Sequence, residues 1–282
     1  MLELLLSFAI AMNMPTQHLE TTVIEPEPVS IVRKDASQPI INAKSGLVMD
    51  LKTGTVLYQK DIYQQLPIAS LTKLMTVKVI LDENPLNEIA TVPAEATQVG
   101  GSTMFLSTNE KITIHDLLRG ALIQSGNDAA VTLAIHNAGS VSAFVDKMNT
   151  KALELDLLNT NFSNPMGFDH PNNYSTAYDL SRLAVEIYKD ERIKEIAQTK
   201  ELKIQSASGN NHSLKNTNAL LDSYLELVGL KTGRTAEALG CFVGITNHDE
   251  PHLSVVLGSN DRFLDTKILL DWSQNTFEYV NF

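Results

Sequence analysis

The chain has 282 residues, a formal net charge of −11, 43% apolar and 20% charged residues, and a single cysteine. The apolar fraction is that of a globular protein and excludes a disordered chain, while one cysteine excludes an internal disulfide. An acidic chain without a basic run is a poor candidate for binding a phosphate backbone, and no Cys/His cluster has the spacing of a zinc module, so both classes are set aside.

The first 14 residues form a segment that resembles a signal peptide. Its apolar run of 12 residues is too short to span a bilayer, which needs about 20, and Ala9-Ile10-Ala11 offers small residues for cleavage. The only charge in the run is Glu3 and the first basic residue is Arg33, so a terminal helix is the alternative. Residues 15–42, polar and Pro-containing, are predicted to be a linker. The signal-like segment predicts export, to the periplasm or the outer face of the cytoplasmic membrane.

From about residue 43 the chain alternates strand and helix patterns. Two short strands, 46–50 and 55–58, are joined by a turn at Lys52-Thr53-Gly54, and an apolar helical pattern follows Ser70. Further helices are expected at 114–124, 128–138, 141–155, 176–189 and 261–273, and further strands at 202–205, 230–232, 241–246 and 253–258.

Strands at both ends of this region, with helices between them, predict an α+β fold. One antiparallel sheet flanked by helices would take strands from both ends of the chain. We expect one domain over residues 43–282, in which 43–85 and 200–282 form the sheet part and 86–199 the mainly helical part.

Ser70-Leu71-Thr72-Lys73 is a Ser-x-x-Lys pattern at a predicted helix start. Positions i and i+3 share a helix face, so the Lys73 amine can reach the Ser70 hydroxyl, and a neutral lysine can activate a serine nucleophile. Burial and nearby positive charge would lower the lysine pKa as this chemistry requires. The alternative is a helix-capping serine with a solvated lysine, because one such pattern is expected by chance in a chain this long.

Two other short patterns gain meaning from their surroundings. Ser-x-Asn occurs four times, starting at Ser107, Ser125, Ser208 and Ser273, and Lys-Thr-Gly occurs twice, at Lys52 and Lys231. Ser125-Gly126-Asn127 separates two apolar helices, which predicts a short buried connection. Lys231-Thr232-Gly233 continues an apolar strand, where a glycine lets a ligand approach the backbone. The stretch at Ser208 is better explained as a turn.

In this order, Ser70-x-x-Lys73, Ser125-x-Asn127 and Lys231-Thr232-Gly233 resemble the three motifs of the penicillin-recognising serine acyl enzymes. The surrounding sequence resembles the low-molecular-mass D-alanyl-D-alanine carboxypeptidases, from about Ala43 to Trp272. The matching stretches are PIASLTKLMT from Pro67, LIQSGNDAA from Leu122, FSNPMG from Phe162, NNYSTAYD from Asn172 and KTGRTAEA from Lys231. The resemblance implies a β-lactamase/transpeptidase-like fold whose all-helical part carries the second motif.

The resemblance also implies three catalytic residues. Ser70 would attack the carbonyl of the penultimate D-Ala, Lys73 would take the serine proton, and Ser125 would relay a proton to the leaving amine. The backbone N–H groups of Ser70 and Arg234 would form the oxyanion hole.

The remaining motif residues would bind substrate. Lys231 would tune Ser125 and attract the terminal carboxylate, Asn127 would hydrogen-bond the substrate backbone, and the strand carrying Thr232 and Gly233 would pair with the peptide. Arg262, ten positions before Trp272, matches a family arginine that helps hold the carboxylate; the alternative is a surface arginine at a helix start. The expected partners are stem peptides ending in D-Ala-D-Ala, with β-lactams as inhibitors, and neither a metal, a cofactor, a nucleic acid nor an obligate protein partner is implied.

One position departs from the family pattern, which usually has Ala-Gly-x-Cys where this chain has Ala238-Leu239-Gly240-Cys241. Leu239 is expected to reshape the strand below the site, and Cys241 is expected to be a small core residue.

Alternative functions remain open at this point. A class A serine β-lactamase would need Glu-x-x-Leu-Asn after the second motif, and Glu154 lies one residue too far from Leu158-Asn159. A non-catalytic peptidoglycan-binding module would not need a base beside a serine. A metal-dependent carboxypeptidase is disfavoured because the seven histidines are scattered, without His-Glu-x-x-His.

Overall fold

The computed structural model describes residues 29–33 and 37–281. The signal-like segment expected at residues 1–14 lies outside them. Within the described residues, no helix is both long and apolar enough to cross a membrane.

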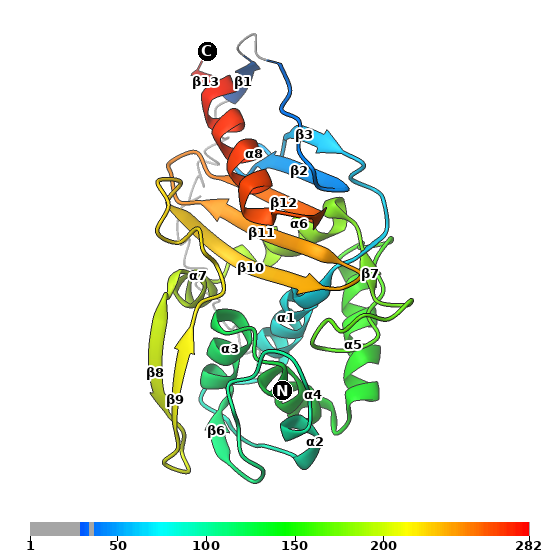
Figure 1. The fold of residues 1–282 in the computed structure, drawn as a ribbon, viewed down its shortest axis with the longest axis vertical. Helices are drawn as coiled ribbons and strands as arrows, with labels where there is room; N and C mark the ends of the chain where they lie inside the picture. Colours follow the sequence, from blue (N-terminus) through cyan, green and yellow to red (C-terminus); the bar gives the residue numbers. More distant parts are fainter. Residues whose placement is uncertain (1–28, 34–36, 282) are drawn as a thin grey trace, which may run out of the picture.

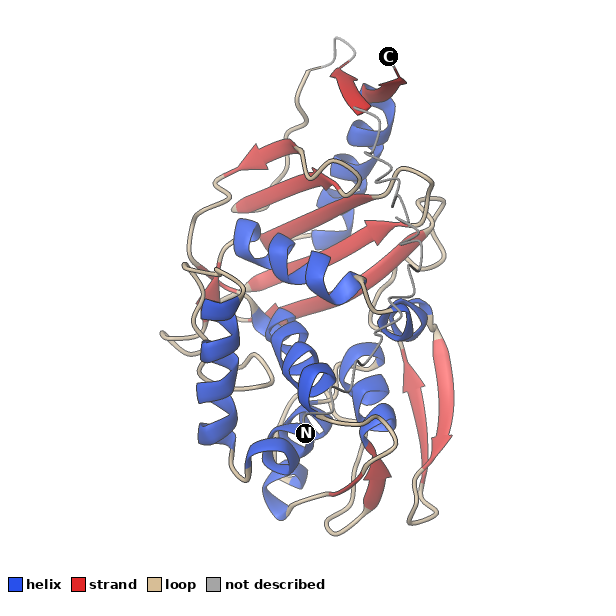
Figure 2. Cartoon of the chain, turned by 180° about the vertical axis from the view of Figure 1, so that it is seen from behind, coloured by secondary structure: helices blue, strands red, loops and turns tan. Residues whose placement is uncertain are grey.

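A five-stranded antiparallel sheet forms the upper half of the molecule in Figure 1. Its strands lie in the order β10-β11-β12-β2-β3, so neighbours come from both ends of the chain, as predicted. Their bounds are β2 (Ser45–Asp50), β3 (Val56–Lys60), β10 (Leu227–Thr235), β11 (Leu239–Thr246) and β12 (His252–Ser259). All eight residues of β12 are buried, because helices cover both faces of the sheet (Figure 2).

Helix α8 (Arg262–Thr276) packs on one face of the sheet and begins at Asp261, whose carboxylate accepts from the Leu264 N–H at 3.1 Å. The buried residues of the molecule form two apolar cores. The smaller one lies between α8 and the sheet and contains Phe242 and Val256. The opposite face is covered by α6 (Ala177–Tyr188). The larger core on that side continues into the helical part of the molecule.

The helical part surrounds α1 (Lys73–Glu83), which packs against α4, α5 and α6. The helices predicted from apolar periodicity are all present, within one residue of the expected bounds at most ends. Their bounds are α3 (Ile114–Ile123), α4 (Asn127–Ala138) and α5 (Val141–Glu154), with the short α2 (Ala94–Thr97) and α7 (Glu191–Gln198) in addition. The exact division of the chain at residues 85 and 199 stays a prediction.

One predicted strand lies elsewhere than expected. β8 (Glu201–Gln205) pairs with β9 (Asn211–Lys215) in a separate two-stranded ribbon and takes no part in the main sheet. Alternate residues of both strands are exposed, so the ribbon buries only one face, whereas the core strands of the main sheet bury both. The turn expected around Ser208 is confirmed, and Gly209 there has φ +88°. Two further strand pairs are β4 (Leu66–Pro67) with β7 (Tyr174–Ser175) and β5 (Ile89–Thr91) with β6 (Lys111–Thr113).

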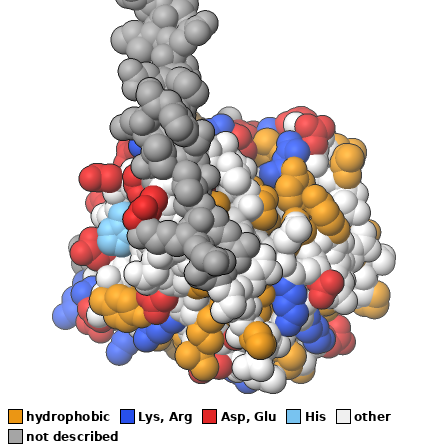
Figure 3. Space-filling view, turned by 90° about the horizontal axis from the view of Figure 1, so that it is seen from above, with side chains coloured by type: hydrophobic (Ala, Val, Ile, Leu, Met, Phe, Trp, Pro, Cys, Tyr) orange, Lys and Arg blue, Asp and Glu red, His pale blue; other side chains and the backbone are white. Residues whose placement is uncertain are grey.

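The segment predicted to be a linker contains a strand. β1 (Val29–Arg33) pairs antiparallel with β13 (Phe277–Asn281), from Val29 opposite Asn281 to Arg33 opposite Phe277. The Val-Ser-Ile-Val-Arg sequence suits a strand, and its partner lies too far along the chain for local patterns to reveal. Both strands of this ribbon lie at the top of the molecule in Figure 1. Seen from above, acidic, basic and hydrophobic side chains are interspersed on this face (Figure 3).

Candidate active site

Ser70 lies on a tight 3₁₀ turn, Ala69–Thr72, which leads directly into α1. Two glycines allow other segments to press against this turn. A Cβ on Gly167 would overlap the carbonyl oxygen of Ala69, and a Cβ on Gly233 would lie 3.0 Å from the Ser70 nitrogen. The serine is therefore held between the 164–168 loop and β10, with its backbone N–H beside the strand.

The Lys73 amine is completely buried and its Nζ has three polar neighbours. It lies 3.0 Å from Ser70 Oγ, 2.7 Å from Asn127 Oδ1 and 2.8 Å from the Met166 carbonyl oxygen. Burial, and secondarily the charge of Lys231, hold the Lys73 pKa well below its ordinary value. A neutral amine has two N–H donors, which the two carbonyl oxygens accept, so its lone pair is left to accept the Ser70 hydroxyl proton.

Ser125 lies on the short buried connection between α3 and α4 that the sequence predicted. Its φ of +62° is a left-handed conformation that few non-glycine residues adopt. Asn127 follows at the start of α4, where its Nδ2 donates to the Gly100 carbonyl oxygen at 2.7 Å. Because Asn127 Oδ1 accepts from Lys73, its amide group orients the lysine as well as facing the cleft.

Lys231, Thr232 and Gly233 lie on β10, which is an edge strand of the sheet and has one side free for pairing. The Lys231 amine donates to the Thr232 carbonyl oxygen at 2.9 Å and is 2% exposed. Burial, with the charge of Arg262, lowers the Lys231 pKa to about 7. The Thr232 hydroxyl lies 2.7 Å from that of Thr217, on the loop before β10.

The motifs meet in one cleft of about 220 Å³. Seven of the nine predicted residues line it, and Lys73 and Lys231 are buried beneath it. The lining comprises Ser70, Gly101, Ser102, Ser125, Asn127, Gly167, Phe168, Thr217, Thr232, Gly233, Arg234, Thr235 and Arg262, without an Asp or Glu. The structure thus brings every predicted site residue together, while their individual roles stay predictions.

Two residues that position the site were not predicted. The buried Asp128 carboxylate accepts from the N–H groups of Met104 at 3.0 Å and Leu106 at 3.0 Å, which fixes the segment that carries Gly100. Asn164 Oδ1 accepts from Gly167 N–H at 2.6 Å, in the turn that directs the Met166 carbonyl at Lys73. An Asn or Asp beside a turn is a signal for such capping, but the sequence alone does not say which backbone it caps.

Leu239, the departure from the family pattern, keeps a backbone conformation typical of glycine, with φ +55°. It pairs with Thr235 where β10 turns into β11. Cys241 is fully buried, and burial raises the pKa of its thiol to about 11, so it is a core residue rather than a reactive thiol.

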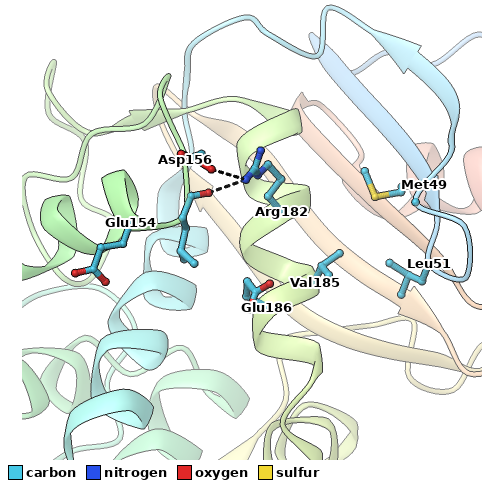
Figure 4. A pocket seen from close by; sticks show the side chains of 9 residues that line it. Met49, Leu51, Glu154, Asp156, Arg182, Val185 and Glu186 are labelled. Atoms are coloured by element: carbon cyan, nitrogen blue, oxygen red, sulfur yellow. Dashed lines mark hydrogen bonds and ion pairs between the residues drawn. The ribbon is translucent and has the colours of Figure 1, made fainter. Parts of the chain in front are cut away.

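A second cavity, of about 360 Å³, lies between the β2–β3 turn, the end of α5 and α6 (Figure 4). Its walls are apolar at Met49, Leu51 and Val185. Its lining also includes three carboxylates, those of Glu154, Asp156 and Glu186. Its lining has no hydroxyl, thiol or amine side chain, so the serine and lysine chemistry of the three motifs is confined to the cleft.

Among the described residues, no group of three or more His, Cys, Asp or Glu side chains could hold a metal ion.

Comparisons with known proteins agree with this geometry. A family model described as D-alanyl-D-alanine carboxypeptidase matches residues 32–261. A D-alanyl-D-alanine carboxypeptidase of Bacillus subtilis is 35% identical over 87% of this chain and 65% of its own length, so the chain spans slightly less than two thirds of that relative. A D-alanyl-D-alanine endopeptidase of Escherichia coli is 36% identical over 84% of this chain and 79% of its own length. The crystal structure of the Streptomyces K15 DD-transpeptidase superposes with a TM-score of 0.80 at 31% identity, covering 85% of this chain and all of that one.

Proposed function

Since the chain belongs to the D-alanyl-D-alanine carboxypeptidase family, we propose that it is a serine carboxypeptidase that removes the terminal D-Ala from peptidoglycan stem pentapeptides. The observation that carries the proposal is the Lys73 amine, buried between Asn127 Oδ1 and the Met166 carbonyl with Ser70 Oγ at 3.0 Å. Such a pair forms and hydrolyses acyl-enzymes.

The first half of the reaction forms an ester on Ser70. Its Oγ attacks the carbonyl carbon of the penultimate D-Ala while the hydroxyl proton passes to the neutral Lys73 amine. The backbone N–H groups of Ser70 and Arg234 would hydrogen-bond the negatively charged carbonyl oxygen. Because the backbone already holds these donors in place, they need not move during the reaction. The C–N bond then breaks, Ser125 gives its proton to the leaving amine and takes the proton held by Lys73, so D-Ala departs with a neutral amino group and Lys73 is again a neutral amine.

The second half hydrolyses the ester. Water adds to the ester carbonyl with Lys73 again as the base, and Ser70 Oγ leaves with a proton. The free edge of β10 supports this assignment, since an extended peptide can pair with it and present its carbonyl to the serine. The cations at the same end, Lys231 and Arg262, suit the terminal carboxylate.

β-Lactams would act as inhibitors by acylating the same serine. No Asp or Glu lines the cleft, so a dedicated base for rapid hydrolysis of the penicilloyl ester is missing from its walls. This favours a carboxypeptidase over a class A β-lactamase, and we expect benzylpenicillin to acylate Ser70 and leave slowly.

We propose that the enzyme acts outside the cytoplasmic membrane, as a secreted protein of peptidoglycan biosynthesis that influences cell shape, because peptidoglycan is its proposed substrate. The apolar segment at residues 1–14 supports export.

The test is mass spectrometry of a digest of diacetyl-Lys-D-Ala-D-Ala. We expect release of one D-Ala, its loss in Ser70→Ala, and its retention in Ser213→Ala, which removes an exposed hydroxyl on β9. Benzylpenicillin should add its mass to the wild type and to Ser213→Ala but not to Ser70→Ala. Fast penicillin turnover without D-Ala release would overturn the proposal in favour of a β-lactamase, and binding without either reaction would favour a peptidoglycan-binding module.

A further inference from the structure

Two arginines lie side by side at the carboxylate end of the cleft. Arg234 on β10 is the direct cross-strand partner of Gly240 on β11, so their Cα–Cβ directions point to the same face of the sheet. A Cβ on Gly240 would lie 3.2 Å from Cβ and 3.5 Å from Cδ of Arg262. Because Gly240 has no side chain, the aliphatic part of the Arg262 side chain can pack against β11 next to Arg234.

Neither guanidinium has an anionic partner among the described residues. Both line the cleft, whose walls include no carboxylate, and Arg262 Nε is buried without a hydrogen-bond acceptor. The carboxylate nearest to Arg262 in sequence, Asp261, caps α8 through the Leu264 N–H, and Asp169, beside the end of β10, accepts from the Thr235 hydroxyl at 2.5 Å. Burial and the charge of Arg234 both lower the Arg262 pKa, which places the two cations within electrostatic range of each other.

The reaction supplies only one negative charge to this end of the cleft when the leaving residue is D-Ala. A bidentate pair with one guanidinium occupies one lone pair on each oxygen of a single carboxylate, and the Thr232 hydroxyl, which also lines the cleft, can donate to a further one. Arg262 lies over the Phe263 ring at 4.4 Å, and neither arginine has an anionic partner among the described residues, so the two cations of the cleft match a ligand that carries two carboxylates.

We propose that Arg234 and Arg262 form a two-carboxylate site that favours leaving residues with an acidic side chain. This inference rests on the proposed function, since it concerns the residue that the enzyme releases. Arg262 would take the α-carboxylate, and the Arg234 side chain would take the second carboxylate at the exposed end of β10. Arg234 would thus act twice, with its backbone N–H on the oxyanion and with its side chain in specificity.

The test compares three substrates of the form diacetyl-Lys-D-Ala-D-X, in which X is Ala, Glu or Gln. Glu and Gln have the same shape and differ in charge. We expect the wild type to show a kcat/KM about tenfold higher for D-Glu than for D-Gln, the size of one charge-assisted hydrogen bond. Arg234→Gln should bring this ratio to about one, because its backbone N–H remains and only the charge is lost, and Arg234→Lys should keep a ratio above one.

Arg182→Gln is the matched control, because it removes a guanidinium from the second cavity (Figure 4). It should keep the wild-type ratio. A Glu-to-Gln ratio near one in the wild type, or an equal ratio in the wild type and Arg234→Gln, would overturn the inference and show that both arginines share one carboxylate.

Failure of the proposed function is distinguishable from failure of the inference. If no terminal residue is released from any substrate, the proposed function fails. Calorimetric binding of the D-Glu and D-Gln peptides to Ser70→Ala and to Ser70→Ala/Arg234→Gln then measures the same ratio without turnover. A preference for D-Glu that depends on Arg234 supports the two-carboxylate site, and its absence overturns it.

Discussion

The catalytic cleft and the second cavity differ in chemistry more than in size. The catalytic cleft, of about 220 Å³, has cations and hydroxyls and no carboxylate in its walls, with two buried lysines beneath it. The second cavity, of about 360 Å³, has three carboxylates around apolar walls, and its one arginine donates to the Leu155 carbonyl at 3.1 Å and contacts Asp156 at 3.3 Å. Of these two, the cavity with the larger volume is the one that lacks the three motifs. The cleft is recognised by cations whose pKa is lowered, those of Lys73, Lys231 and Arg262. The charged groups of the second cavity are exposed or paired.

The largest expected effect is on the acylation rate, when Lys73, the proposed general base, is replaced. Lys73→Gln keeps a polar side chain but removes the group that accepts the serine proton, so acylation by benzylpenicillin should slow by roughly 10² to 10⁴-fold. Stopped-flow or quenched-flow measurement of the acylation rate checks this.

Lys151→Gln is the control, since Lys151 is paired with Asp82 and with Glu154 of the second cavity. It should acylate at the wild-type rate. An equal loss in both variants would mean that lysines matter through the overall charge and not through the cleft.

A second contrast uses one glycine from each cavity. Gly167 and Gly54 both have positive φ, +91° and +72°, but only a Cβ on Gly167 meets neighbouring atoms, those of Ala69 and Ser70. Gly54→Ala should cost about 1–2 kcal/mol of unfolding free energy, from the backbone conformation alone. Gly167→Ala should cost about 1–3 kcal/mol more, from overpacking, and should also slow acylation because the serine turn must move. Urea unfolding and acylation rates measure both, and equal costs would contradict the close packing described here.

The next effect is on the pH dependence of the unfolding free energy, through Lys231 beneath the cleft. The unfolded chain keeps Lys231 protonated up to its ordinary pKa of 10.5, but the folded chain only up to about 7. The unfolded state therefore binds more protons between these values, and this lysine makes stability rise with pH there, by up to about 1.4 kcal/mol per pH unit. The difference in unfolding free energy between the wild type and Lys231→Met should change by about this amount from pH 8 to pH 9, in favour of the wild type. A pH-independent difference would mean that Lys231 is charged in the fold at pH 8.

The smallest effect is expected in the second cavity. The Arg182–Asp156 pair has side chains that are 39% and 73% exposed, so Asp156→Asn should change the unfolding free energy by no more than about 1 kcal/mol. Its acylation rate should equal that of the wild type. A loss of acylation would show that this cavity communicates with the cleft.

Local patterns predicted most of the helices and strands, but not which strands pair with one another. Apolar periodicity located α3 to α6 and the strands of the main sheet because these elements bury a regular face. The same patterns could not assign a partner to residues 201–205, which pair locally, or to 29–33, which pair with the far end of the chain.

The site divides in the same way. Ser125 and Lys231 could be selected from repeated motifs because their flanks were apolar, so their position in the core was predictable. The adjacency of Arg234 and Arg262 depends on the register that sets Arg234 opposite Gly240 and on the packing of α8 above it. Likewise, Asp128 was part of a matched stretch, but its hydrogen bonds to residues 104 and 106 exist only once the chain has folded.

The β1–β13 ribbon has a mechanical consequence. Val29 lies opposite Asn281, so a pulling force applied at these two residues would load the ribbon from its open end and separate one residue pair after another. Antiparallel strands pulled in this way open at low force, because each hydrogen bond bears the load alone. Tension would next reach the contacts that join residues 37–42 to α8, where the Trp272 indole donates to the Ser37 carbonyl and Asp265 accepts from Asn42. A moderate stretch of the chain ends would thus be absorbed at the pole far from Ser70, and the spacing of Ser70 and Lys73 would be the last to change.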